Sequence, residues 1–340
     1  MALTIQRDDA ALAAGFTRWF TRNQDLADLC VVDLHRPSAG YSSETVMVQM
    51  AWSGEGKRHS RSFVLRMAPS EAGTFPRYDL LPQWQAQLAV ADAGVPVADP
   101  VLEQDARWLG APFLVMPRVD GHIIGAVARH DRWLCSRTRP DRARVYANFI
   151  TTLSAIHRAD PGAAAEVPRR DNASELDFWD EYLKWSSDGS PVPVLVGALQ
   201  WCRRHRPASE PEPALLWGDP RLENMVFGDD LAPLAVLDWD MTSVAPPEHD
   251  LAWFTSHEMT MDHLFGGRTD GAPDRCETVA LFEECEGRPV RDLDWYEALA
   301  MVRSAAVMTR IGYLRLAAGA APLLPIDDNP ILDLLKGRIA

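Results

Sequence analysis

The segment that decides the fold reads LLWGDPRLEN at residues 215–224, and a second segment, AVLDWD, follows at residues 235–240. Asp219 comes after a short apolar run and a glycine, a pattern that predicts a tight, exposed turn. Asn224 comes five residues after Asp219 and precedes another apolar run, and Asp238 ends a third. If these last two runs form neighbouring strands, Asn224 and Asp238 lie close together.

The three side chains have the chemistry that phosphoryl transfer requires. The amide oxygen of Asn224 and the carboxylate of Asp238 are hard oxygen ligands, which suit Mg²⁺ carried by a nucleotide. Asp219, on the turn between, would orient a hydroxyl group and accept its proton. Phosphoryl transfer needs a metal that neutralises the phosphates and an acceptor that is held in position.

The composition limits the class of protein. The 340 residues, 47% hydrophobic and 24% charged, are enough for a packed core in one large domain or two modest ones. The formal net charge of −14 disfavours nucleic acid as a partner. No stretch is apolar enough to span a membrane, and residues 1–9 lack the pattern of a secretory signal.

The cysteines indicate a reducing compartment. The chain has five cysteines, which are scattered along it, and no CxxC pair occurs. This scattered spacing argues against a disulfide framework or a zinc site. We therefore expect free thiols and a cytoplasmic location.

The apolar pattern divides the chain into a sheet-rich part and a helix-rich part that meet near residues 116–121. The first part is expected to contain helices at residues 9–22 and 80–93, with strands at residues 31–34, 45–52, 61–67, 101–102 and 112–115. The second part is expected to contain helices at residues 140–157, 177–185, 193–205, 248–257, 274–286, 295–316 and 330–336, with short strands at 214–217, 224–227 and 234–237.

The ordered motifs resemble the aminoglycoside phosphotransferase family, in particular its broad bacterial branch whose substrates are mostly unassigned. The D-x4-N spacing and the later strand-end Asp match the catalytic-loop and metal-ligand pattern of kinases, and PEHDLAW at residues 247–253 matches the family wording. The resemblance implies an α+β, two-lobed protein-kinase-like fold. Its smaller lobe is an antiparallel sheet and its larger lobe is mainly helical.

The resemblance also assigns roles within the catalytic segments. Asp219 would be the catalytic base, and Asn224 and Asp238 would be the Mg²⁺ ligands. Asp250 resembles a structural acid that braces the catalytic loop. Most of the family has His where this chain has Trp217, which we interpret as a residue that packs the loop.

The N-terminal part would supply the nucleotide site. A G-x-S-S turn resembles the family's nucleotide-covering turn, where Gly40 permits a positive φ and Ser42 and Ser43 meet phosphate oxygens. Arg66 stands where kinases carry a strand lysine that contacts the α- and β-phosphates. Its usual Glu partner corresponds to Gln83, so a hydrogen bond would replace an ion pair.

The segment FLVMPRVDG at residues 113–121 resembles the hinge between the lobes. The resemblance implies that adenine is held by the carbonyl of Pro117 and the N–H of Val119. Proline lacks an N–H but keeps its carbonyl, so it is compatible with this role. We therefore expect a nucleotide-clamping lobe at residues 1–116, a hinge at 117–121, and a catalytic and substrate-binding lobe at 122–340.

Several other residues admit two interpretations. His157 is expected to pack against the catalytic loop rather than take part in chemistry. Trp179, Trp185 and Trp201 would either stack on an acceptor or pack in the core. Arg221 would either help to neutralise the transferring phosphate or lie at the surface.

These expectations lead to an enzyme that transfers the γ-phosphoryl group of ATP or GTP to a hydroxyl of a small molecule, with Mg²⁺. The acceptor would be an aminoglycoside, a macrolide, a nucleoside-type natural product or a hydroxyacyl compound, with antibiotic resistance as one role. Residues 258–297 hold eleven acidic residues against four arginines, either a docking surface for a cation or a solvated face. The alternative function is a nucleotide-binding, catalytically silent pseudokinase that acts as a sensor or scaffold.

Overall fold

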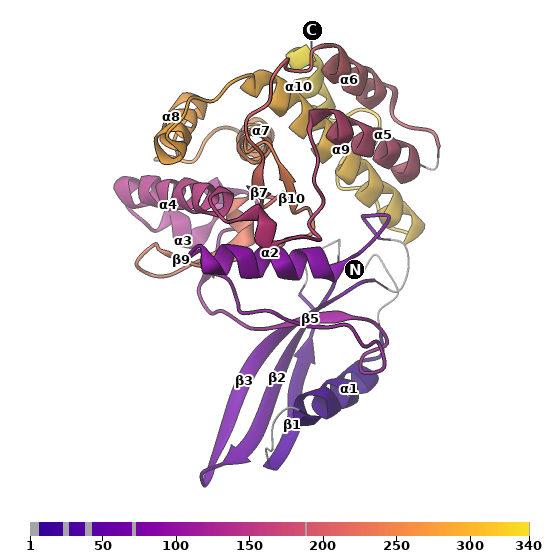
Figure 1. The fold of residues 1–340 in the computed structure, drawn as a ribbon, viewed down its shortest axis with the longest axis vertical. Coiled ribbons are helices and arrows are strands. Elements are labelled where there is room, and N and C mark those ends of the chain that lie inside the picture. The colour runs from indigo at the N-terminus through magenta and orange to yellow at the C-terminus, as the bar shows by residue number, and fades with distance from the viewer. Residues whose placement is uncertain (1–6, 23–26, 38–42, 70–72, 188, 340) are drawn as a thin grey trace.

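A computed structural model describes residues 7–22, 27–37, 43–69, 73–187 and 189–339. In this part of the chain a five-stranded sheet lies at one end of the molecule and most of the helices lie at the other (Figure 1). The prediction of an α+β fold with a sheet-rich N-terminal part is therefore confirmed.

The N-terminal sheet is antiparallel throughout, with the strand order β1-β2-β3-β5-β4. Its two longest strands, β2 and β3, form a hairpin around Glu55 and Gly56, whose φ angles are 51° and 71°. Two consecutive positive φ angles give the twist that a two-residue hairpin needs. The strands are β1 (Ala27–His35), β2 (Glu44–Gly54), β3 (Lys57–Met67), β4 (Val101–Glu103) and β5 (Phe113–Pro117).

Alternation along β3 decides which side chains face the rest of the molecule. Phe63, Leu65 and Met67 share one face, where they pack with helix α1 (Asp9–Arg22) in a single apolar cluster. Arg66 therefore lies on the opposite face, because successive side chains of a strand point to opposite sides. This is the face toward helix α2 and the C-terminal part.

Helix α2 (Leu80–Asp92) lies between the sheet and the helical part (Figure 1). Its first residue, Leu80, packs with Leu114 and Met116 of β5 in a small apolar cluster. Its later residues Ala86, Ala89 and Val90 belong to the large core of the C-terminal part. This helix is thus shared by the two cores.

The C-terminal part surrounds that large core, in which Trp179, Trp217 and Trp239 are almost completely buried. Its long helices α7 and α9 pack against each other. The elements are β6 (His122–Ile123), α3 (Arg132–Cys135), α4 (Arg139–His157), α5 (Asn172–Ser186), α6 (Pro193–Arg204), β7 (Ala214–Leu216), β8 (Met225–Phe227), β9 (Pro233–Val236), β10 (Ser243–Ala245), α7 (Glu248–Phe265), α8 (Arg275–Glu286), α9 (Leu293–Ala317) and α10 (Pro330–Ile339), with 3-10 turns η1 (Ala128–His130), η2 (Pro161–Ala163) and η3 (Leu222–Asn224).

Several helices extend beyond their predicted limits, and the two largest extensions, of α5 and α7, each have a local reason. Helix α5 begins several residues early because the side chain of Asp171 accepts the N–H of Ser174 and caps it. Helix α7 continues to Gly266, whose φ of +80° gives a left-handed C-terminal cap. Among the described helices, none has the length and apolar character needed to cross a membrane.

Candidate active site

The loop that carries Asp219 is fixed from below by a buried carboxylate. Asp250, at the start of α7, is 1% exposed and accepts the backbone N–H groups of Trp217 at 2.8 Å and Gly218 at 2.9 Å. Gly218 has a φ of +91°, and a Cβ atom there would lie 2.1 Å from the carbonyl oxygen of Met241. The bend before Asp219 therefore requires glycine and depends on Asp250.

His157 supports the same carboxylate from the end of α4. Its Nε2 lies 3.1 Å from Asp250, and its Nδ1 lies 3.5 Å from Glu286. Burial acts to lower the pKa of His157, but the two carboxylates outweigh it and raise that pKa to about 9. His157 is thus a cation at neutral pH that neutralises part of the buried charge beneath the loop.

Trp217 ties the loop to the segment that carries Asp238. Its indole is fully buried and donates its N–H to the carbonyl of Leu237 at 2.8 Å. The side chain fills the core beside Trp239, with ring centroids 6.3 Å apart. The geometry agrees with a packing role for this position.

Asp219 is held by three side-chain donors. Its Oδ1 accepts the indole N–H of Trp253 at 2.7 Å. Its Oδ2 accepts Arg221 Nη2 at 2.6 Å and Asn224 Nδ2 at 2.9 Å. Asp219 is only 8% exposed, so the prediction of an exposed turn is wrong: helix α7 brings Trp253 over the carboxylate and encloses it.

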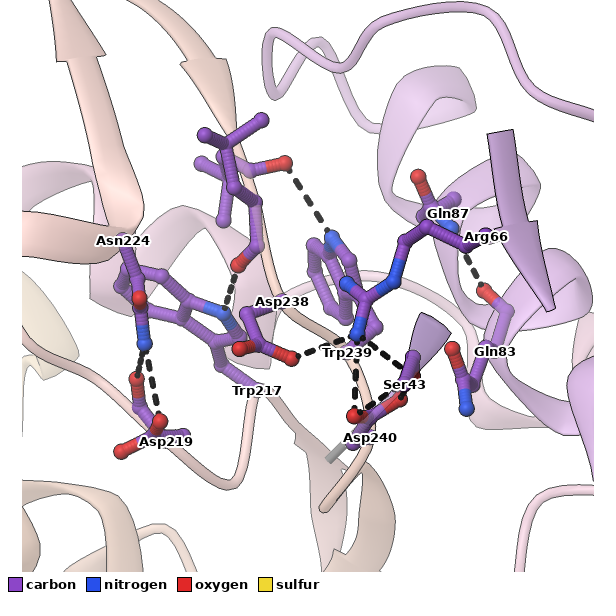
Figure 2. A network of polar contacts seen from close by, with 12 residues as sticks. Ser43, Arg66, Gln83, Gln87, Trp217, Asp219, Asn224, Asp238, Trp239 and Asp240 are labelled. Atoms are coloured by element: carbon purple, nitrogen blue, oxygen red, sulfur yellow. Dashed lines mark hydrogen bonds and ion pairs between the residues drawn. The ribbon is translucent and has the colours of Figure 1, made fainter. Parts of the chain in front are cut away.

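Asn224 and Asp238 lie at the same end of a strand pair. Strands β8 and β9 are antiparallel neighbours, with Met225 opposite Val236. One step further, the N–H of Leu237 donates to the carbonyl of Asn224 at 2.8 Å. The side-chain nitrogen of Asn224 faces Asp219, which leaves its side-chain oxygen available to a cation (Figure 2).

Arg66 joins the sheet to the acidic residues that follow β9. Its Nη2 lies 3.0 Å from Asp238 Oδ1, 2.9 Å from Asp240 Oδ2 and 3.2 Å from Ser43 Oγ (Figure 2). Burial opposes a charge on Arg66, but Asp240 and Asp238 raise its pKa above the ordinary value. Burial also acts to raise the pKa of Asp238, and Arg66 outweighs it and holds that pKa low. The cluster therefore keeps its charges.

The expected hydrogen bond between Arg66 and Gln83 is not formed. The side-chain oxygen of Gln83 is buried without a hydrogen-bond partner among the described residues, and Arg66 is engaged by Asp238, Asp240 and Ser43 instead. The carboxylates of Asp238 and Asp240 carry charge, so the Arg66 guanidinium binds them in preference to the neutral amide of Gln83. The prediction of a hydrogen bond between Arg66 and Gln83 is therefore wrong.

Five other residues are expected to bind the nucleotide. Pro117 ends β5 opposite Phe63, and Val119 packs at the edge of the small cluster around Leu114, so the hinge candidates border an apolar surface. Gly40 and Ser42 lie outside the described residues. Ser43 is described, and it joins the Arg66 cluster rather than standing apart from it.

Two residues in the site had no role in the sequence-based prediction. Asp240 pairs with Arg66 and accepts a hydrogen bond from Ser43 Oγ at 3.1 Å, although it stands only two residues after Asp238 in the same AVLDWD segment. Trp253 ends the PEHDLAW segment and donates to Asp219. Both stand in the quoted motifs, but only the folded backbone shows which neighbours they contact.

Among the described residues, no group of three or more His, Cys, Asp or Glu side chains could hold a metal ion. All five cysteines are free, in agreement with the absence of a disulfide framework.

Comparison with known proteins identifies the fold. The structure matches a Ralstonia eutropha protein with a provisional aminoglycoside phosphotransferase assignment, at a TM-score of 0.68, 22% identity, and coverage of 96% of this chain and 94% of that one. It also matches the GDP and kanamycin complex of APH(2")-IIia, at a TM-score of 0.54, 15% identity, and coverage of 95% and 97%. These likenesses confirm the prediction of a protein-kinase-like fold.

The curated relatives are longer proteins. Acyl-CoA dehydrogenase family member 11 of Mus musculus is 27% identical over 235 residues, which are 64% of this chain and 29% of that protein. The chain thus spans less than a third of that relative. The pattern of the phosphotransferase enzyme family (APH) matches residues 33–274, most of the chain. The family suggested by the D-x4-N motif is confirmed, and the chain belongs to the phosphotransferase enzyme family.

Proposed function

We propose that this protein transfers the γ-phosphoryl group of ATP or GTP to a hydroxyl of a small molecule, with Mg²⁺. The observation that carries the proposal is the enclosed, hydrogen-bonded grouping of Asp219 and Asn224 beside the ion pairs of Arg66 with Asp238 and Asp240. A general base, hard oxygen ligands and a phosphate-reaching cation are the parts that phosphoryl transfer requires.

The residues present fit a nucleotide-bound Mg²⁺. Asn224 offers a side-chain oxygen and Asp238 an ionised carboxylate, and both are hard ligands of the kind Mg²⁺ prefers. Mg²⁺ supplies charge neutralisation at the phosphate oxygens when it is bound. Two protein ligands suffice, because Mg²⁺ keeps several waters and takes its other ligands from the phosphates.

Asp219 is placed to act as the base. Trp253 and Asn224 fix its two oxygens, so its carboxylate is held in one plane before an acceptor arrives. Arg221 is 27% exposed at the side chain and pairs with Asp219 and Glu223, so it is not a free surface cation. We assign it to the charge balance of the loop, beside the transferring phosphate.

Adenine or guanine would lie at the hinge. Pro117 offers a carbonyl and Val119 an N–H, next to the apolar cluster that contains Leu114 and Met116. Gly40, Ser42 and Ser43 would cover the phosphates. A lobe boundary at residues 117–121 follows from this placement.

The acceptor is a small hydroxyl compound, and two carboxylates of the acidic stretch are not available to bind a cationic one. Glu297 is buried and pairs with Arg275 and Arg338, and Glu286 contacts His157. These two carboxylates pair with cations of the protein itself and so do not form part of a docking face. Aminoglycosides, macrolides, nucleoside-type compounds and hydroxyacyl compounds all stay candidates; the names of the curated relatives favour the last.

A second candidate function is supported by the Arg66 cluster. Arg66 occupies one oxygen of Asp238 and pairs with Asp240, so part of the carboxylate charge is neutralised within the protein itself. A pseudokinase that binds a nucleotide without turning it over would have the same contacts. The retained Asp219 and Asn224 favour the enzyme, which we place in the cytoplasm with neither nucleic acid nor membrane as a partner.

One experiment separates the two functions. The protein, Mg²⁺ and ATP or GTP are incubated with a library of hydroxyl compounds, and products are analysed by mass spectrometry. We expect a product that has gained one phosphate with the wild type and with Asp229→Asn, a matched change at a side chain that is 86% exposed. Asp219→Asn should give at most a trace of it. Nucleotide binding without any transfer to the library would contradict the enzyme and favour the pseudokinase.

A further inference from the structure

Trp253 is the indole that lies against the candidate base. It is 8% exposed, sits on α7, and donates its N–H to Asp219 Oδ1 at 2.7 Å. Arg221 and Asn224 both bind the other oxygen, Oδ2. Among the described residues, Trp253 is therefore the side chain whose hydrogen bond fixes Oδ1, and without it the carboxylate can turn about its last bond.

A buried cation lies behind this indole. The guanidinium of Arg303, on α9, lies 4.9 Å from the ring centroid of Trp253 and 5.4 Å from that of Trp179. Its Nε lies 3.6 Å from Glu175 Oε1, which also accepts the indole N–H of Trp179 at 2.8 Å. A continuous series of contacts thus leads from Asp219 through two tryptophans and an arginine to a buried glutamate.

Packing alone does not explain this arrangement. Arg303 is 4% exposed, and its Nε has no hydrogen-bond partner among the described residues. Burying such a group costs free energy that an apolar side chain would avoid. A cation over the face of an indole is attracted to the ring and polarises it, which strengthens the N–H as a donor.

We propose that Trp253 is a positioning residue for Asp219, and that Arg303 supports it by holding and polarising the indole from its face. The inference rests on the proposed function. A carboxylate with one oxygen fixed by Trp253 and the other by Asn224 presents a constant lone pair to the acceptor hydroxyl. Trp253 thus affects the chemical step through Asp219, without touching the substrate.

Trp253→Phe tests the proposal because it keeps an aromatic ring and removes the donor. We expect kcat to fall about 10- to 100-fold, the size expected for a lost hydrogen bond to a charged group, while KM for the nucleotide and the acceptor is unchanged. Arg303→Met should lower kcat by about tenfold or less. The matched control is Trp295→Phe, which removes a buried indole N–H that donates to the Cys202 carbonyl at 2.8 Å, and it should leave kcat unchanged.

A double variant separates positioning from general damage. In an Asp219→Asn background, Trp253→Phe should cause no further loss of residual turnover, because the residue it acts through is already altered. A full additional loss in that background would overturn the proposal. So would an unchanged kcat in Trp253→Phe, or a fall in kcat that Trp295→Phe reproduces.

An NMR measurement tests the same contact without any turnover. The indole N–H signal of Trp253, assigned by its absence in Trp253→Phe, should move in Asp219→Ala while the Trp295 signal stays in place. An unmoved Trp253 signal would overturn the proposal whether or not the wild type is active. A wild type that transfers no phosphate, with the signal moved as expected, contradicts the proposed function alone.

Discussion

The loop around Asp219 and the face of the sheet that carries Arg66 are stabilised in different ways. The loop around Asp219 is held within the C-terminal part, by the buried Asp250 beneath it and Trp253 above it. The sheet side contributes one cation, Arg66, whose partners Asp238 and Asp240 belong to the other part. The loop is thus held in position by residues of the C-terminal part alone, whereas the position of Arg66 depends on contact between the N-terminal sheet and the C-terminal part.

The largest effect is expected at the loop. Asp219→Asn keeps the size of the side chain and removes the acceptor of the hydroxyl proton, so turnover should fall about a thousandfold or more. Steady-state kinetics measures the fall, and calorimetry should show unchanged nucleotide affinity. Substantial turnover in this variant would show that the loop is organised around another residue.

The next effect concerns stability. Asp250→Ala would leave the N–H groups of Trp217 and Gly218 without their acceptor and remove one of the two carboxylates beside the cation of His157, so the free energy of unfolding should fall by about 3 kcal/mol or more. Chemical denaturation measures it, with the exposed Asp229→Ala as the control. If Asp250→Ala does not fold, Asp250→Asn should show a smaller loss of the free energy of unfolding. Equal free energies of unfolding in the wild type and these variants would contradict the view that Asp250 braces the loop.

The third effect depends on pH through His157. Because its pKa is raised from 6.5 to about 9 on folding, its contribution is fully present below pH 6.5 and is lost as the pH rises through 9. The free energy of unfolding should therefore fall by up to about 3 kcal/mol across this range. His157→Gln should flatten the profile, and a wild-type profile identical to that of His157→Gln would show that the histidine is neutral.

The smallest effect is expected on the sheet side. Arg66→Met removes the cation that would reach the phosphates, so nucleotide affinity should fall about tenfold or more. The nucleotide affinity of Arg66→Lys should lie between those of the wild type and Arg66→Met, because an ammonium keeps the charge but lacks the paired N–H donors of the guanidinium. Arg58→Met, an exposed arginine on the same strand, is the control. Unchanged affinity in Arg66→Met would make the arginine a structural link between the parts.

The sequence predicted what depends on periodicity and on spacing. The apolar pattern of residues 61–67 predicted part of strand β3, and two short apolar runs predicted the β8–β9 pair that brings Asn224 and Asp238 to one end. These features are local, so they can be inferred from a single chain. The strand pair is observed as expected.

Contacts between distant segments were not predictable in the same way. Trp253 reaches Asp219 across 34 positions, and Arg66 reaches Asp238 across 172. Gln83 corresponds to the usual Glu partner of the family, and nothing in the sequence shows that Asp240 pairs with Arg66 instead. The enclosure of Asp219 escaped prediction for the same reason, since it depends on where α7 packs.

The dependence of ATP affinity on Mg²⁺ tests most directly whether Asp238 holds the metal of a bound Mg²⁺–ATP complex while Asp219 leaves nucleotide binding unchanged. We expect Mg²⁺ to tighten ATP binding by about tenfold or more in the wild type and equally in Asp219→Asn, and Asp238→Asn to lose most of this gain. An ATP affinity that does not respond to Mg²⁺ in the wild type would contradict this metal site. So would an equal gain in ATP affinity on adding Mg²⁺ in the wild type, Asp219→Asn and Asp238→Asn.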